Sequence, residues 1–264
     1  KNEFKVSGEL DDKAEGFELK TTGDKTEFIV KMPRNLGWGN NGDGSNLTVF
    51  MPKSSRLEFA GVNVSVTAKT LKKGAEVDVV NGEITVDDIS GTVKLSTVNG
   101  DVNAQNLSGN IQFETVNGEI NDKQSSGELR FSAVNGDIKS STTANDVRLE
   151  NVNGDIDFTL SSIKSLRINT VNGEAEIHIS ELLKGADVRY ESVSGDADFY
   201  FPQSVSAQFE IKAHANGKII NKVTSDKVTK AKYGPSSDLE FSANGGSASV
   251  EMDTISGRIE LRTK

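Results

Sequence analysis

Residues 98–115 read VNGDVNAQN followed by LSGNIQFET, and this 18-residue unit decides the fold. Its opening motif, Val-Asn-Gly followed by an acid, begins at residues 80, 98, 116, 134 and 152, a strict period of 18. A sixth copy begins at residue 171, and a variant, Val193-Ser194-Gly195-Asp196, begins 22 residues later. A fixed period of this kind is typical of one structural unit stacked on copies of itself.

Each unit predicts two short strands. Both nine-residue halves begin with an aliphatic residue, a polar residue and Gly, and continue with alternation such as Ile111-Gln112-Phe113. Alternating apolar and polar residues after a turn are typical of a strand with one buried face. The density of Gly, Asn, Thr and Val disfavours a helix. The sequence therefore predicts an all-β fold.

Two β architectures compete. Asn-Gly between alternating hydrophobic residues is typical of a hairpin, which would produce an antiparallel meander. Alternatively, each unit is one coil of a right-handed parallel β-helix, with equivalent residues stacked at the strand spacing of ~4.8 Å. The solenoid is favoured because it explains why the same Val and Asn return at every second turn. Val then predicts a core column and Asn an amide hydrogen-bond ladder. The ladder would contain Asn81, Asn99, Asn117, Asn135, Asn153 and Asn172.

The repeats decay toward both ends of the chain. We expect residues 1–56 to form an N-terminal β segment that caps the solenoid, with strands near residues 28–32 and 47–51. Residues 57–200 hold the regular ~18-residue coils, and residues 201–264 are expected to form divergent coils of the same solenoid. Irregular β caps at both ends would cover the open sheet edges.

Charge and composition exclude several classes of partner and site. The net charge is −9, and residues 80–200 hold 20 acids against 9 bases, so nucleic acid and anionic membrane surfaces are disfavoured. The chain contains no Cys, which excludes disulfides and thiolate metal sites, and no apolar run long enough to span a bilayer. It begins at Lys1, and we expect that a signal peptide has been removed.

Several stretches resemble a known family. Leu47-Thr48-Val49-Phe50-Met51-Pro52-Lys53 leads into Gly-acid-aliphatic units, and Phe199-Tyr200-Phe201-Pro202 and Thr254-Ile255-Ser256-Gly257-Arg258-Ile259 come late in the chain. Over residues 45–264 this pattern resembles the bacterial adhesin-like DUF4097 family of β-strand-repeat proteins. The resemblance implies a right-handed β-helix and a place outside the cytoplasm, in the cell envelope. It implies no catalytic residues.

The acid after each Gly is the one motif position without an evident structural role. In a solenoid these acids would form a column, either a solvated ladder or, less favoured, a row of calcium sites. No cage of acids at close sequence spacing completes such a site, so no metal or other cofactor is predicted. The column would contain Glu83, Asp101, Glu119, Asp137, Asp155 and Glu174.

Other candidate site residues are few. Trp38, in a loop rich in Gly and Asn, either faces a partner or folds back onto the end of the stack. His178 alternates with Ile177 and Ile179, and His214 lies near a turn, so both are predicted to be surface residues.

We therefore expect a non-enzymatic solenoid of the periplasm or cell surface that binds protein or glycan partners through its long faces and loops. One alternative is a structural envelope protein whose copies associate through exposed coil ends. A less favoured alternative is a polysaccharide-cleaving β-helix, which would use paired carboxylates. Such enzymes usually have long loops and aromatic platforms, whereas this chain has one Trp and mostly tight turns.

Overall fold

The computed structural model describes residues 3–33 and 44–264, and the regular structure in these ranges consists of β-strands only. The chain divides into two compact units, Lys1–Ser55 and Arg56–Lys264. Trp38 lies outside the described residues.

The N-terminal unit contains two antiparallel strand pairs. β1 (Lys5–Glu9) pairs with β4 (Asn46–Phe50), and β2 (Gly16–Thr22) forms a hairpin with β3 (Lys25–Lys31). β3 and β4 correspond to the strands expected near residues 28–32 and 47–51. The capping role expected for residues 1–56 stays a prediction.

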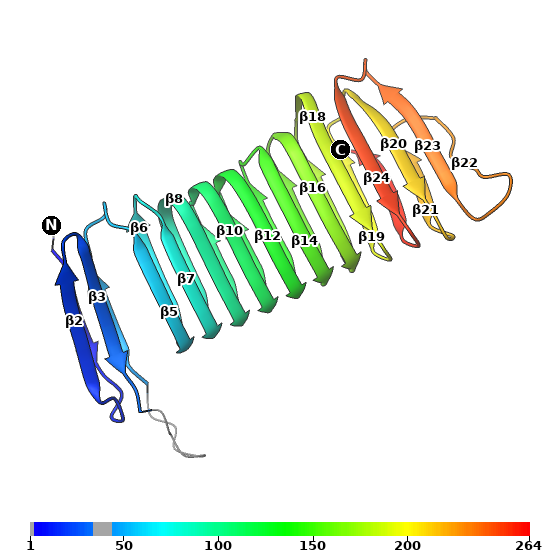
Figure 1. Ribbon diagram of the computed structural model, residues 1–264. Helices are drawn as coiled ribbons and strands as arrows, with labels where there is room; N and C mark the ends of the chain where they lie inside the picture. The colour runs from blue at the N-terminus through cyan, green and yellow to red at the C-terminus, as the bar shows by residue number, and fades with distance from the viewer. Residues whose placement is uncertain (1–2, 34–43) are drawn as a thin grey trace. The chain divides into compact units, whose positions relative to one another are not determined.

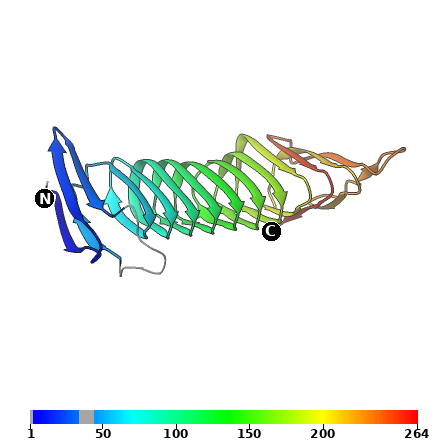
Figure 2. The same ribbon diagram turned by 60° about the horizontal axis from the view of Figure 1, so that its bottom comes forward.

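The second unit is a parallel β-solenoid in which eight coils follow one another in chain order (Figures 1 and 2). Each coil contributes one strand to each of two sheets. Sheet 1 contains β5 (Leu57–Asn63), β7 (Ala75–Asn81), the end of β8 (Ile84–Asn99), β10 (Ser108–Asn117), β12 (Ser126–Asn135), β14 (Asp146–Asn153), β16 (Ile163–Asn172) and β18 (Leu182–Ser192). Sheet 2 contains β6 (Val66–Leu71), the start of β8, β9 (Val102–Gln105), β11 (Ile120–Lys123), β13 (Ile138–Thr142), β15 (Ile156–Leu160), β17 (Glu174–Ile179) and β19 (Asp196–Phe201).

Equivalent motif positions pair directly across neighbouring coils. Gly109 pairs with Gly127 and Phe113 with Phe131, and the strands run parallel. The antiparallel meander is therefore wrong, and the parallel solenoid is confirmed for these coils.

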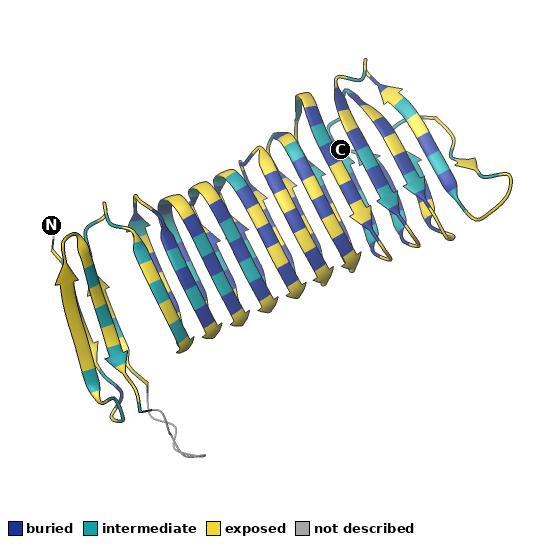
Figure 3. Ribbon diagram, in the orientation of Figure 1, coloured by how far each residue is buried: buried dark blue, intermediate teal, exposed yellow. Residues whose placement is uncertain are grey.

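The core is a set of stacked columns formed by every second residue of each strand (Figure 3). Ile111 and Phe113 are fully buried, and the Phe113 ring stacks on the Phe131 ring with 4.8 Å between centroids. Such columns bury apolar surface in register, which is the main favourable term for a repeat fold.

The Val of the repeated motif is not part of this core, so the predicted Val core column is wrong. Val98 is 40% exposed and Val116 39%, whereas the preceding Thr97 and Thr115 are buried. Because side chains alternate along a strand, the residue before Val points inward and Val itself points outward. The exposed column contains Val62, Val80, Val98, Val116, Val134, Val152, Val171 and Val193.

The Gly of the motif allows neighbouring coils to approach closely at the corner. Gly154 has a φ of +137°, and a Cβ there would overlap the carbonyl oxygen of Gly136 in the preceding coil. Glycine meets both demands because it lacks a Cβ.

Residues 201–264 extend the same two sheets, but not in chain order. The added elements are β20 (Ala207–Ala213), β21 (Lys218–Lys222), β22 (Thr229–Lys230), β23 (Ser237–Ala243), β24 (Ala248–Thr254) and β25 (Arg258–Thr263). In sheet 1, β24 lies between β18 and β20, and in sheet 2, β25 lies between β19 and β21. β23 then pairs antiparallel with β20. The last coil of the chain is therefore inserted between two earlier ones.

Candidate binding surfaces

The motif asparagines form a continuous amide ladder along one corner of the solenoid. Asn99 Nδ2 donates to Asn81 Oδ1 at 2.8 Å, and Asn117 Nδ2 donates to Asn99 Oδ1 at 2.9 Å. The ladder begins one coil earlier than the repeated motif, because Asn81 donates to Asn63 at 2.7 Å. The same bond links the remaining members, Asn135, Asn153 and Asn172.

The acids that follow Gly have structural roles, contrary to the interpretation from sequence. The Asp101 carboxylate accepts a hydrogen bond from the backbone N–H of Glu119 in the next coil, at 2.9 Å. Asp137 accepts in the same way from Asp155, and Asp155 from Glu174, again at 2.9 Å. These carboxylates satisfy backbone donors where the chain enters sheet 2.

The longer glutamates of this column bond to other side chains. Glu83 accepts hydrogen bonds from Thr85 at 3.0 Å and from Asn103 at 2.7 Å, and Glu119 accepts one from Lys139 at 2.5 Å. Among the residues that the structure describes, no group of three or more acids and histidines is arranged to hold a metal ion. In the described residues, the carboxylates of the column therefore do not converge on a common point where calcium could bind.

A column of arginines crosses sheet 1, and sequence reasoning missed it. Arg130, Arg148, Arg167 and Arg189 pair in register on β12, β14, β16 and β18. Their side chains are about half exposed. Because they occupy successive strands, neighbouring side chains start ~4.8 Å apart.

Each arginine of this column has a carboxylate partner beside it. Arg130 contacts Glu128 at 2.5 Å, Arg148 contacts Glu150 at 2.7 Å and Arg189 contacts Asp187 at 3.1 Å. Arg167 reaches Asp187 only at 3.7 Å. Exposed pairs of this kind contribute little stability, so a ligand can displace them at small cost.

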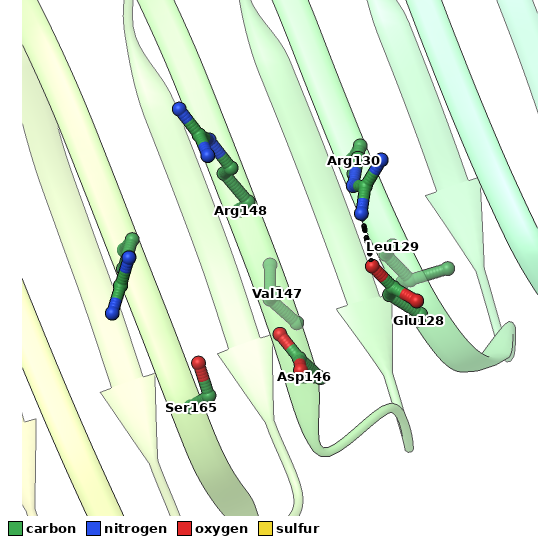
Figure 4. Close-up of a pocket in the computed structure, with 8 residues that line it drawn as sticks. Glu128, Leu129, Arg130, Asp146, Val147, Arg148 and Ser165 are labelled. Carbon is green, nitrogen blue, oxygen red and sulfur yellow. Dashed lines mark hydrogen bonds and ion pairs between the residues drawn. The ribbon is translucent and has the colours of Figure 1, made fainter.

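Three of these arginines line a cavity of about 250 Å³, and Figure 4 labels two of them, Arg130 and Arg148. The other lining residues are Arg167, Glu128, Asp146 and Ser165, with Leu129 and Val147. A guanidinium presents several donors in a plane that matches a carboxylate or phosphate. The lining of the cavity therefore combines three guanidinium groups with two carboxylates.

The opposite sheet carries a block of carboxylates at the same level of the stack. Asp157, Glu176 and Asp198 pair in register on β15, β17 and β19, beside the acid column of Asp155, Glu174 and Asp196. Within the described part of the chain, Asp155, Asp157 and Glu174 have no Lys or Arg partner at ion-pair distance. Sheets 1 and 2 therefore differ in charge at this level.

The block ends where the inserted C-terminal coil supplies cations. Arg258 donates to both Asp198 oxygens at 2.9 and 3.2 Å, and its Nε donates to Asp196 at 3.3 Å. Hydrogen bonding to Asp198 raises the pKa of the Arg258 guanidinium, so this side chain stays charged.

A buried glutamate connects the same coil to its other neighbour. Glu260 is 4% exposed and accepts hydrogen bonds from Arg258 at 2.9 Å and Arg262 at 2.6 Å, with Lys222 at 2.5 Å. Hydrogen bonds from Arg262 and Lys222 lower the pKa of the Glu260 carboxyl to about 2. The charged network joins β25 to β19 and β21.

One carboxyl faces the core. Asp122, on β11, is 2% exposed and accepts hydrogen bonds from the hydroxyls of Ser125 and Ser140. Burial raises the pKa of this carboxyl to about 6, although the two hydroxyls lower it. In the same inward column, the neighbouring coils carry Ala104, Ser140 and Phe158, so the sequence signal was an acid in a column of small or apolar residues.

The two histidines occupy different environments. His178 stacks on Tyr200 with 4.3 Å between ring centroids, and its Nε2 lies 2.8 Å from Glu176. His214 is half exposed, and its Nε2 lies 3.4 Å from Asp253. Neither histidine has a Ser hydroxyl among its hydrogen-bond partners in the described structure.

The family model for the Toastrack domain, DUF4097, matches residues 11–262. The chain belongs to the Toastrack DUF4097 family. The resemblance seen in the sequence is thereby confirmed, and it extends further toward the N-terminus than residue 45. No curated protein and no solved structure matches the chain. No helix in the described ranges of this Toastrack protein is long and apolar enough to cross a membrane.

Proposed function

We propose that this Toastrack protein is a non-enzymatic recognition element of the bacterial cell envelope that binds an elongated anionic partner along sheet 1. The arginine column of Arg130, Arg148, Arg167 and Arg189 is the observation that carries this proposal. It places four guanidinium groups in one line across neighbouring strands of sheet 1.

The carboxylates beside the column restrict the partner. A broad anionic surface, such as a membrane or a nucleic-acid duplex, would meet Glu150 and Asp187 together with the arginines. A polymer with a single line of carboxylates or phosphates can lie over the arginines alone. An acidic glycan has this chemistry, and a protein with an acidic ridge is the second class of partner.

A binding role fits the cavities better than catalysis does. The arginine-lined cavity of about 250 Å³ and the acid-lined one of about 180 Å³ on sheet 2 are both small for an enclosed substrate site, which typically measures ~300–1,000 Å³. Affinity would then come from several weak contacts along one partner. Placement in the cell envelope follows from the family resemblance and belongs to this proposal.

A glycan array of acidic and neutral bacterial oligosaccharides tests the proposal, with Arg148→Gln/Arg167→Gln as the variant. We expect retention on acidic glycans and a loss of about tenfold in the variant, equivalent to about 1.4 kcal/mol. The matched control is Lys69→Gln/Lys73→Gln, which removes the same charge from exposed lysines outside the column.

Equal binding by both variants would show that the column is not the binding surface. Release of new reducing ends from any glycan would overturn the non-enzymatic assignment. If no glycan is retained, the glycan class is excluded, and proteins with acidic ridges become the partners to test.

A further inference from the structure

The inserted coil occupies a slot whose two walls both precede it in the chain. β24 pairs with β18 on one side and β20 on the other, and β25 pairs with β19 and β21 (Figure 1). In the regular stack, each coil instead lies between the coil before it and the coil after it. Residues 248–263 therefore fill a gap formed by chain that ends at residue 222.

The slot holds this segment through three kinds of contact. Both edges of each strand are paired, and Val250, Met252 and Leu261 are fully buried. Arg258 and Glu260 add the charged network described above. An empty slot would leave two unpaired strand edges in each sheet, a state that favours capture of another strand.

The turn that leads into the segment is short. It spans residues 244–247, and Asn244, Gly245 and Gly246 all have positive φ, so the chain reverses tightly there. The chain here crosses the start of β20, where Ser206 Oγ donates to the Asn244 carbonyl at 2.7 Å and the Ala248 N–H donates to the Ser206 carbonyl at 3.1 Å. Short hinges favour exchange of the segment that follows them.

We propose that the slot also accepts the β24–β25 segment of a second copy, so that two molecules exchange their C-terminal coils. Every contact within the slot is the same in the exchanged dimer, so the two forms differ mainly at the turn of residues 244–247. The exchange does not use the arginine column and is independent of the proposed function.

Engineered disulfides test the exchange, because the chain has no native Cys to compete. Gln208 on β20 and Ser249 on β24 are in register on adjacent parallel strands, at a separation suited to a disulfide. The Gln208→Cys/Ser249→Cys protein is unfolded, refolded over a range of protein concentrations, oxidised and run on a non-reducing denaturing gel. We expect a cross-linked monomer at low concentration and a covalent dimer whose fraction rises with concentration.

Thr92→Cys/Asn110→Cys is the matched control, because these residues are in register on β8 and β10 within the sequential stack. It is expected to give only cross-linked monomer at every concentration. Inserting two glycines between Gly245 and Gly246 relaxes the turn and is expected to lower the dimer fraction several-fold.

Exclusively intramolecular cross-links at all concentrations would overturn the proposal, as would equal dimer fractions in the control. If the first pair fails to fold, Glu210→Cys/Glu251→Cys reports on the same two strands. Failure of both folded pairs to cross-link would contradict the insertion of β24 itself.

Discussion

One outward column of sheet 1 changes sign between two regions of the solenoid. On β12 to β18 it consists of arginines, ending with Arg189, and the next residue in register, on the inserted β24, is Glu251. Glu210 and Glu240 continue the column on β20 and β23. The spacing between neighbouring strands is the same in both regions. The side chains alone therefore decide where an anion can bind.

The two regions also differ in how their coils are held. In the sequential stack each coil contacts neighbours about 18 residues away, whereas β18 and β24 pair residues separated by 62 positions, such as Asp187 and Ser249. Closing a longer loop costs more conformational entropy, so the inserted coil is expected to be the less stable region.

The largest expected effect is at the corner of the sequential stack. Gly154→Ala places a Cβ against the Gly136 carbonyl and is expected to cost about 3 kcal/mol or more of stability. Gly245→Ala, in the C-terminal region, has a φ of +88° but open space around its Cβ, so only backbone strain of about 1 kcal/mol is expected. Urea denaturation measures both, and equal losses would show that close approach at the corner is not what requires glycine.

A buried carboxyl makes the sequential stack sensitive to pH. Because the folded-state pKa of Asp122 is about 6, above its unfolded value, the protein binds a proton more tightly when folded. The contribution of Asp122 to stability is therefore expected to be most favourable below about pH 4 and to fall as the pH rises through 6. Asp122→Asn is expected to stabilise the protein by about 2–3 kcal/mol at pH 8 and to change little at pH 4.

Urea midpoints from pH 4 to 8 measure this difference, and Asp157→Asn, an exposed carboxyl on the same sheet, serves as the control. A stabilisation by Asp122→Asn that does not vary with pH would contradict the assigned titration.

A substitution in the charged network of the inserted coil is expected to destabilise that coil and leave the sequential stack unchanged. Glu260→Gln removes the charge that Arg258, Arg262 and Lys222 share, and should speed amide exchange in residues 248–263 roughly tenfold, about 1.4 kcal/mol. Since the folded-state pKa of Glu260 is lowered to about 2, its contribution is present above its unfolded pKa and is lost as pH falls toward 2. Hydrogen exchange with mass spectrometry separates the regions, and equal acceleration in the sequential stack would contradict a local role.

The smallest effect is expected in the amide ladder. Asn117→Ala removes two exposed side-chain hydrogen bonds, to Asn99 and from Asn135, and is expected to cost about 1 kcal/mol. Asn63→Ala, at the end of the ladder, removes one and should cost less. If the two substitutions have the same effect on thermal melting, the cost does not follow the number of ladder bonds removed, and the ladder bonds are not what Asn117 contributes to stability.

Much of the stack could be predicted from the sequence because a strict period repeats each local contact. The Asn ladder follows from stacking at 18 residues, and so does the parallel register. The arginine column was equally accessible, since Arg130, Arg148, Arg167 and Arg189 follow the same 18-, 19- and 22-residue steps as the motif. The signal lies in the middle of the strand, outside the repeated Val-Asn-Gly-acid motif.

Other features could not be predicted in this way. The apolar character of the motif Val predicts a core position, but strand alternation gives that position to the residue before it. The insertion of β24–β25 has no local signal in the sequence, because it depends on which strand edges are left unpaired by the chain up to residue 222. Asp122 and its neighbour Ser140 depart from the apolar pattern of their column, and the repeat pattern does not predict such local departures.

The most direct test of the arginine column as the binding surface is a calorimetric titration with acidic oligosaccharides of increasing, defined length. We expect affinity to rise with length until the ligand spans Arg130 to Arg189, and then to level off, because Gln112 and Glu251 border the column. Affinity that is independent of length, or that keeps rising beyond this span, would contradict the assignment.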